Sequence, residues 1–242
     1  MLDNITYKRL KTIVLSLTIS LFFSCEEEVN LAFSEINILE EKDAVVEINI
    51  PKAEGDDAIC SSINSILGAY TNNALNIDSG NNVKGTFEET IAQFNSSYLK
   101  FRNQMNEEQQ LELTPWEAGV DGEVTYQSNR VISIAMNTYL NTGGIHGTSK
   151  VSFLNFDAST GNQIQYNEFI KDKNELKKFL KLYFEKEVES ISFDDFKLPE
   201  TIGLNEEGVI ILYNANEIPS YTDNLTEFIV PFDEIEHFLK TY

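Results

Sequence analysis

Residues that usually carry chemistry are scarce in this chain. Its 242 residues include two cysteines, two histidines and one tryptophan. A zinc site takes Cys, His or carboxylate ligands at short spacings, and no helical pattern here carries two such ligands. The Gly-x-Ser-x-Gly motif of a nucleophile elbow is also absent. We therefore expect no metal and no other cofactor, and no residue is named as catalytic.

Basic residues are also few. The chain has 18 Lys and Arg against 39 Asp and Glu, a formal charge of −21. Such an excess repels phosphate groups, so nucleic acid is not an expected partner. The same field favours a cationic partner, although an acidic surface also serves simply to keep an exported protein soluble.

Only one long hydrophobic run is present. Lys8, Arg9 and Lys11 precede residues 12–23, which are uncharged and mostly apolar. A membrane-spanning helix needs roughly 20 apolar residues, and this run is shorter and is followed by acidic residues. Residues 1–24 are therefore predicted to be an export signal peptide. Its removal takes three basic residues and Asp3, which leaves 15 basic and 38 acidic residues and a charge of −23.

The residues around Cys25 resemble a relaxed lipobox, in which a small residue precedes a cysteine that receives diacylglycerol. We predict lipidation at Cys25 and a tether over 25–34, which anchors the protein to the outer membrane, facing the periplasm or the cell surface. The acidic residues 26–28 resemble the surface-export signal of Bacteroidota-type lipoproteins, or act as a solvated spacer. The other cysteine, Cys60, lies in an apolar pattern and is expected to be buried.

Hydrophobic periodicity predicts the elements of the first half. Alternation over 46–50 indicates a strand that Pro51 ends. Residues 56–76 repeat apolar positions at helical spacing. A second helix follows Gly85, where Thr86 and Glu89 form the pattern of a capping box. Strands are expected at 124–126 and 132–140.

The second half continues with the same two periods. A strand through Val151 and Phe153 precedes a turn at 157–161, and a helix is expected to begin at Asp172. Strands follow at 209–213 and 227–230, then a short closing helix from Pro231. Adjacent strands with helices set apart from them predict an α+β fold with a mainly antiparallel sheet and amphipathic helices packed on it. We expect an N-terminal subdomain at 35–127 and a C-terminal subdomain at 128–242, together forming one globular unit.

A glycine-rich segment interrupts the strands at 141–147. Gly143, Gly144 and Gly147 flank His146, and such glycines allow a tight turn or the close approach of another chain. No strand-to-helix context makes the segment a phosphate loop. The other histidine, His237, is expected to be solvated beside acidic neighbours. Residues 157–168 begin with Asp and end with Glu, as a calcium-binding loop does. Gly161 lies one position earlier than such a loop requires, so a hairpin turn is favoured.

The order of several short motifs resembles one known family. The Gly-Gly-x-His-Gly segment, residues 153–157 with Thr160 and Gly161, residues 204–213, residues 216–221 and residues 228–232 are similar to the paired domain of unknown function of RsiV-like anti-sigma factors and PdaC-like peptidoglycan deacetylases. In these proteins it forms the extracytoplasmic domain and the non-catalytic part, respectively. The resemblance covers residues of about 40–242. It implies an α+β envelope domain that binds a ligand, and RsiV-like members recognise lysozyme.

These observations lead to a functional hypothesis. We predict a non-enzymatic cell-envelope lipoprotein that binds a cationic protein such as lysozyme, or an envelope glycan. The predicted contacts are in the loop between the last two strands, where two tyrosines around a proline are typical of interface hot spots, and in the glycine segment. An envelope carbohydrate-active hydrolase with scattered carboxylates and a structural or assembly lipoprotein are the alternatives. The predicted binding residues are Tyr213, Asn214, Glu217, Pro219, Tyr221, Gly143, Gly144 and His146.

Overall fold

The computed structural model describes residues 31–77, 85–144, 146–187, 196–215, 217 and 225–240. The predicted signal peptide, Cys25 and the first part of the tether lie outside these residues. Residues 31–34, which the sequence assigned to the tether, already belong to a strand, because the run from Leu31 alternates in burial and pairs with a neighbour.

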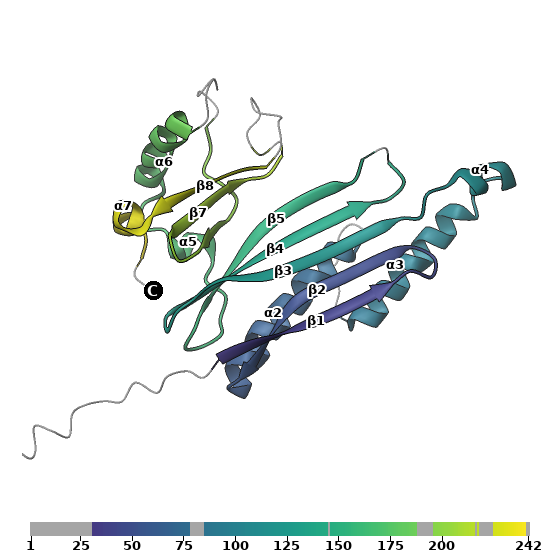
Figure 1. Ribbon diagram of the computed structural model, residues 1–242, viewed down its shortest axis with the longest axis horizontal. Helices are drawn as coiled ribbons and strands as arrows, with labels where there is room; N and C mark the ends of the chain where they lie inside the picture. The colour runs from purple at the N-terminus through teal and green to yellow at the C-terminus, as the bar shows by residue number, and fades with distance from the viewer. Residues whose placement is uncertain are drawn as a thin grey trace, which may run out of the picture.

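A five-stranded sheet with the order β1-β2-β3-β4-β5 forms the centre of the molecule (Figure 1). All its neighbours are antiparallel except β2 and β3, which are parallel. A parallel pair needs a crossover connection, and three helices between β2 and β3 provide it. The strands are β1 (Leu31–Glu40), β2 (Val45–Gly55), β3 (Glu117–Gln127), β4 (Val131–Asn141) and β5 (Thr148–Asp157), and the helices are α2 (Asp57–Leu75), α3 (Phe87–Arg102) and α4 (Glu107–Glu112).

Side-chain caps begin three of the helices, as the sequence predicted for the helices that start after Thr86 and at Asp172. Asp56 accepts hydrogen bonds from the backbone of Ala58 and Ile59 at the start of α2. Thr86 and Glu89 form a capping box at the start of α3. Asp172 accepts from two backbone N–H groups where α6 (Lys173–Glu187) begins. These side chains satisfy donors that a helix end otherwise leaves without partners.

The prediction that Pro51 ends its strand is wrong. Strand β2 continues to Gly55, and Pro51 pairs with Glu35 of β1. The pairing of β2 with β3 stops at Asn49, so the missing N–H group of Pro51 removes no bond from that ladder. Gly122 of β3 makes room for the proline ring, because a Cβ there would lie 2.6 Å from Pro51 Cδ.

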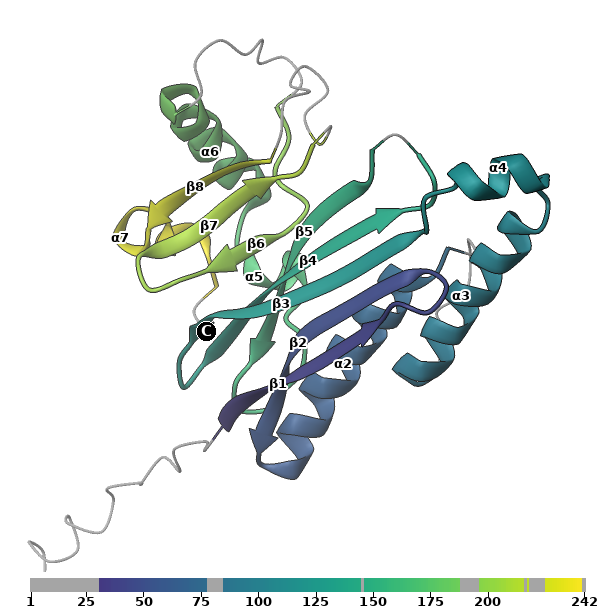
Figure 2. The same ribbon diagram turned by 45° about the vertical axis from the view of Figure 1, so that its right-hand side comes forward.

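The first hydrophobic core lies between the sheet and two helices. Strand residues such as Ile48, Val120 and Ile134 are fully buried against Ile63 and Phe94 of α2 and α3. Figures 1 and 2 show both helices on one face of the sheet. The alternate strand residues therefore point to the opposite face, since successive side chains of a strand alternate.

A second unit follows the large sheet. It contains α5 (Tyr166–Phe169), α6, β6 (Ile202–Leu204), β7 (Gly208–Tyr213), β8 (Thr226–Pro231), α7 (Phe232–Ile235) and the 3₁₀ turn η2 (Glu236–Phe238). Strands β6, β7 and β8 form an antiparallel sheet in that order. One face of this sheet, with Ile211 and Val230, is buried with Leu180 and Phe184 of α6 in a separate core.

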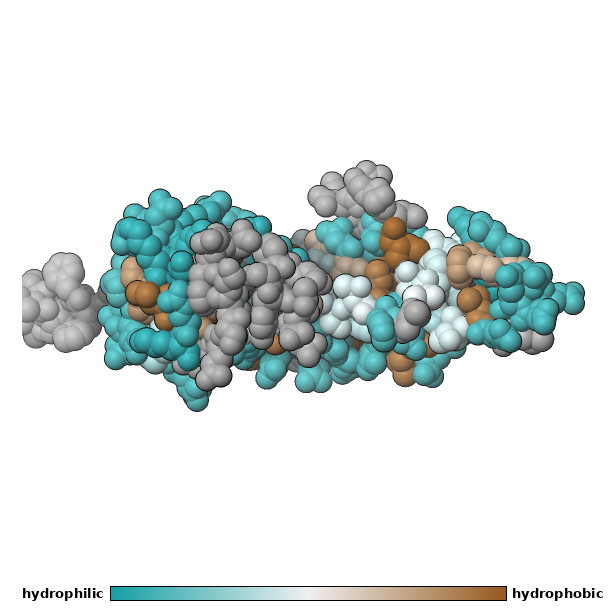
Figure 3. All heavy atoms as spheres, turned by 90° about the horizontal axis from the view of Figure 1, so that it is seen from above, coloured by the Kyte–Doolittle hydropathy of each residue, from teal (hydrophilic) through white to brown (hydrophobic). Residues whose placement is uncertain are grey.

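The two sheets pack on each other at one end. Ile210 and Leu212 of β7 form a small third core with Phe153 of β5, together with the half-buried Ala135 and Val151. The small unit thus packs on β4, β5 and the end of β3, where Tyr126 lies against Phe232 (Figure 2). Hydrophilic residues cover most of the described surface seen in Figure 3.

The α+β prediction is confirmed, with a mixed five-stranded and an antiparallel three-stranded sheet. The expected boundary between residues 127 and 128 lies between β3 and β4, which are hydrogen bonded to each other, so the large sheet continues across it. Among the described helices, none is long and apolar enough to cross a membrane.

Candidate functional site

The loop predicted to bind a partner begins inside the core. Tyr213 has only 1% of its surface exposed, and its hydroxyl donates to the backbone carbonyl of Lys197 at 3.0 Å. Burial raises the pKa of this phenol well above its ordinary value. Tyr213 is therefore part of the core, because β7 is buried on both faces between α6 and β5, and its predicted contact with a partner stays a prediction.

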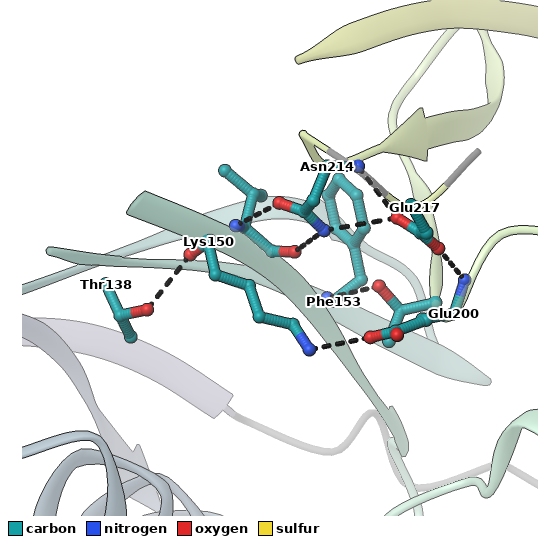
Figure 4. A network of polar contacts seen from close by, with 8 residues as sticks. Thr138, Lys150, Phe153, Glu200, Asn214 and Glu217 are labelled. Atoms are coloured by element: carbon teal, nitrogen blue, oxygen red, sulfur yellow. Dashed lines mark hydrogen bonds and ion pairs between the residues drawn. The ribbon is translucent and has the colours of Figure 1, made fainter. Parts of the chain in front are cut away.

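Asn214 and Glu217 serve as structural anchors at the edge of the large sheet. The Asn214 side chain accepts from the Val151 N–H at 2.7 Å and donates to the Val151 carbonyl at 2.9 Å, as a paired strand would. Glu217 in turn accepts from the backbone N–H groups of Asn214 and Glu200 (Figure 4). Thr201 accepts from the Phe153 N–H at 3.2 Å. These side chains satisfy the free edge of β5, which an exposed edge strand otherwise offers to another chain.

An ion pair closes the same junction. Lys150 Nζ lies 2.6 Å from Glu200 Oε2, and this hydrogen bond raises the pKa of the lysine. Both side chains are about half exposed, so the pair contributes little to stability. Its effect is to hold the strand end of β5 to the segment before β6. Pro219 and Tyr221 lie outside the described residues, but the segment that leads to them starts from this fixed base.

The glycine segment packs on an aromatic cluster. Gly143 has a φ of +92°, and a Cβ there would lie 3.4 Å from Trp116 Nε1. Trp116 is buried among Phe94, Tyr98 and Phe101, with ring centroids 5.2–5.9 Å apart. Gly143 thus has a structural reason to be glycine, namely the turn and the close approach to the indole.

The remaining residues of this segment are at the surface. Gly144 and His146 are exposed at the tip of the β4–β5 hairpin. Strand β5 begins directly after this tip and carries Val151, to which Asn214 is bonded. The structure therefore brings the hairpin and the base of the 213–221 loop to the same end of β5. The two bonded residues, Val151 and Asn214, are 63 residues apart in the sequence.

A polar surface that the sequence did not indicate lies across β1 to β4, on the face of the large sheet opposite α2 and α3. Asn37 pairs with Asn49, Asn49 with Asp121, and Asp121 with Asn137, so one polar row crosses four strands. Acidic side chains lie beside this row on the same face. We call this surface the open half-face, and it consists of Glu35, Asn37, Glu47, Asn49, Asp121, Glu123 and Asn137, all exposed or half-buried.

Hydrogen bonds organise the open half-face. The Asn49 amide nitrogen donates to Glu47 at 2.9 Å and to Asp121 at 3.0 Å, and so lies between two carboxylates. The Asn37 amide makes a longer contact of 3.5 Å to Glu35. Four of these seven residues are carboxylates and none is basic, so the set carries four negative charges. Sequence alternation predicted that Glu47 and Asn49 point away from the core, but only strand pairing places them beside Asp121.

The described residues offer few groups for metal or nucleophile chemistry. No group of three or more His, Cys, Asp or Glu among them is placed to hold a metal ion. Cys60 is buried, as expected, and burial together with Asp56 and Asp57 raises the pKa of its thiol. Asp157 forms the predicted turn, where it accepts from Ser159 and Thr160. Burial raises the pKa of Asp157, but these hydrogen bonds outweigh it and the pKa is lowered.

Comparisons with known proteins agree with this architecture. Residues 38–149 match the model of the family described as deacetylase PdaC. A crystal structure of a DUF3298 family member from Bacteroides fragilis superposes with a TM-score of 0.67 at 19% identity, covering 88% of this chain and 95% of that one. A DUF3298 family protein from Pseudomonas aeruginosa gives 0.57 at 16% identity, covering 89% and 96%. A search of curated proteins found no match. Residues 38–149 are thus similar to the PdaC family, and the chain has the same fold as the two DUF3298 structures.

Proposed function

We propose that this protein is a non-enzymatic binding domain of the cell envelope whose ligand is a cationic protein, with a lysozyme the best candidate. The observation that carries the proposal is the open half-face. It combines carboxylates and amides on a broad strand surface and contains no basic side chain. Charge complementarity of this kind speeds association with a basic partner and selects against acidic ones.

The packing of the two units supports a single binding region. The small sheet packs on Ala135 of β4, two residues from Asn137 of the open half-face, so the two surfaces are neighbours on one face of the large sheet. Hydrogen bonds of Asn214 and Glu217 fix the start of the 213–221 loop against β5. A fixed base lowers the entropic cost of binding through the loop tip, where the sequence places Pro219 and Tyr221.

Anchoring in the envelope is part of the proposal. Export through residues 1–24 and lipidation of Cys25 would hold the domain at the outer membrane, where secreted lysozymes act on the cell wall. An acyl anchor leaves the folded domain in water and needs no membrane-spanning helix.

Calorimetric titration of the purified protein with a basic lysozyme tests this function. We expect binding that weakens as salt rises from low to physiological ionic strength, because exposed charges are screened. The variant Asp121→Asn/Glu123→Gln removes two charges from the open half-face and should weaken binding about tenfold. Tyr221→Ala should weaken it by a similar factor if the loop tip is a hot spot.

A matched control separates the site from total charge. Glu107→Gln/Glu108→Gln removes two exposed charges at the start of α4, which lies beyond the end of the large sheet (Figure 1), and should change affinity less than about twofold. Equal losses in both double variants would show that only net charge matters. No complex at high micromolar concentrations of both proteins would refute lysozyme binding.

The polar row favours an envelope glycan as the second candidate. Its amide and carboxylate oxygens can accept hydrogen bonds from sugar hydroxyls, and Tyr139 lies half-buried on the same face beside Gly147. Co-sedimentation with purified peptidoglycan tests this candidate. Retention that Asp121→Asn/Glu123→Gln abolishes, without lysozyme binding, would favour the glycan over the protein.

A further inference from the structure

A cavity of about 420 Å³ lies where the two units meet, at the β3–β4 turn. Its lining comes from the β3–β4 hairpin, from α5 and the residues after it, from β6 and from the closing α7–η2 segment. The apolar part includes Tyr126, Phe169 and Phe232, and the rings of Tyr126 and Phe232 lie 6.0 Å apart. This volume and this aromatic lining are in the range of sites for small organic ligands.

The charged part of the lining differs in sign from the rest of the protein. It contains Lys171, His237 and Lys240, with Glu236 as the one carboxylate. The whole chain has 18 basic residues against 39 acidic ones, so a cavity with more cationic than anionic side chains reverses the general ratio. Neither lysine takes part in an ion pair among the described residues.

The backbone holds the two lysines beside each other. Ile170 and Leu239 form an isolated antiparallel bridge. The Lys171 N–H donates to the Phe238 carbonyl at 2.8 Å, and the Lys240 N–H donates to the Phe169 carbonyl at 3.0 Å. The Lys171 ammonium makes only a long contact, 3.4 Å, to the His237 carbonyl. The paired backbone thus brings the Lys171 and Lys240 side chains to one cavity. Their ammonium groups can still donate hydrogen bonds to a ligand.

We propose that this cavity binds a small amphipathic carboxylate, with the apolar body against the aromatic lining and the carboxylate at Lys171 and Lys240. A carboxylate accepts charge-assisted hydrogen bonds from ammonium groups, which are stronger than neutral ones. The site is separate from the open half-face, and its ligand has the opposite charge to the partner proposed there.

Three probes with the same eight-carbon chain test the charge preference: octanoate, octanol and octyltrimethylammonium. Calorimetric titration of the purified protein should show the order octanoate, then octanol, then the cation. The net charge of −21 alone predicts the reverse order for the two ions, so non-specific attraction cannot produce this result.

Two matched lysine variants locate the site. Lys171→Gln/Lys240→Gln should weaken octanoate binding about tenfold and leave octanol binding unchanged, because only the ionic contacts are removed. Lys177→Gln/Lys197→Gln makes the same change in charge at exposed positions outside the cavity and should change neither. Since all four lysines are exposed, both variants are expected to fold.

Photo-crosslinking gives an independent readout. An octanoate analogue that carries a diazirine on its chain should label peptides containing residues 126–131, 169–171 and 232–240. The proposal is overturned if octanoate binds no better than the cation, if both lysine variants lose the same affinity, or if the label falls elsewhere.

Discussion

The Asn214→Ala variant tests whether a residue predicted from sequence as a ligand contact is instead a structural anchor. The substitution removes the amide that pairs with both backbone groups of Val151. It leaves the contacts of the Asn214 backbone to Glu217 in place. It also removes a longer contact of 3.4 Å from the Asn214 amide to Glu217 Oε2, so the perturbation covers the edge of β5 and its junction with Glu217.

The magnitude follows from the two lost hydrogen bonds. A hydrogen bond in a folded protein contributes a net stability of about 0.5–1.5 kcal/mol, so the loss of both should cost about 2 kcal/mol. Val151 is half-buried, and water therefore replaces only part of the lost pairing. In a domain of this size about 2 kcal/mol corresponds to a fall in Tm of about 4–8 °C.

Circular dichroism and the fluorescence of Trp116 give two independent unfolding signals, because the chain has one tryptophan. Asn129→Ala is the matched control, since Asn129 is exposed in the β3–β4 turn. Its Tm should stay within about 1 °C of the unchanged protein. Asn214→Asp should behave like Asn214→Ala at neutral pH, because its carboxylate would face the Val151 carbonyl and Glu217.

The opposite pattern would refute the reasoning. If Asn214→Ala melts like Asn129→Ala but binds lysozyme more weakly, the amide is a recognition group and not an anchor. If both stability and binding are unchanged, the edge of β5 does not depend on this side chain.

Three further outcomes are expected. Cys25→Ala should release the protein from the membrane fraction or leave its precursor uncleaved, since each buried acyl methylene contributes about 0.8 kcal/mol; fractionation like the unchanged protein would contradict lipidation. Gly161→Ala should lower the free energy of unfolding in urea by about 2–4 kcal/mol, because φ is +69° and the new Cβ would lie 2.5 Å from the Ile59 carbonyl oxygen. As the control, Gly119→Ala meets only ordinary contacts and should lower it by less than about 1 kcal/mol. Stability should fall above pH 10, because burial keeps the pKa of Tyr213 above its ordinary 10.0 and the unfolded chain therefore releases this proton first. The slope from one tyrosine is at most about 1.36 kcal/mol per pH unit, and Tyr213→Phe should reduce the difference in Tm between pH 8 and pH 11; an unchanged difference would assign the alkaline loss to other groups.

The sequence predicted an element well where its formation depends on residues close to it in the chain. The caps at Thr86 and Asp172 depend on residues within one helical turn, so they could be identified from the sequence alone. The strand β1 was assigned in part to the tether, because its half-buried alternation follows an acidic run and its pairing partner β2 is distant in the chain. The short β6 has only three residues and carries too little periodicity to be recognised.

The candidate site shows the same division more sharply. Sequence alone determined the acidic charge, the export signal pattern and the alternation that turns Glu47 and Asn49 away from the core, because these depend on composition and on neighbours along the chain. Only the tertiary structure decided that Tyr213 is buried and that Asn214 caps β5, since both depend on contacts with residues far away in sequence. Strand register likewise decided that Asn49 meets Asp121 across 72 residues, which no local pattern encodes.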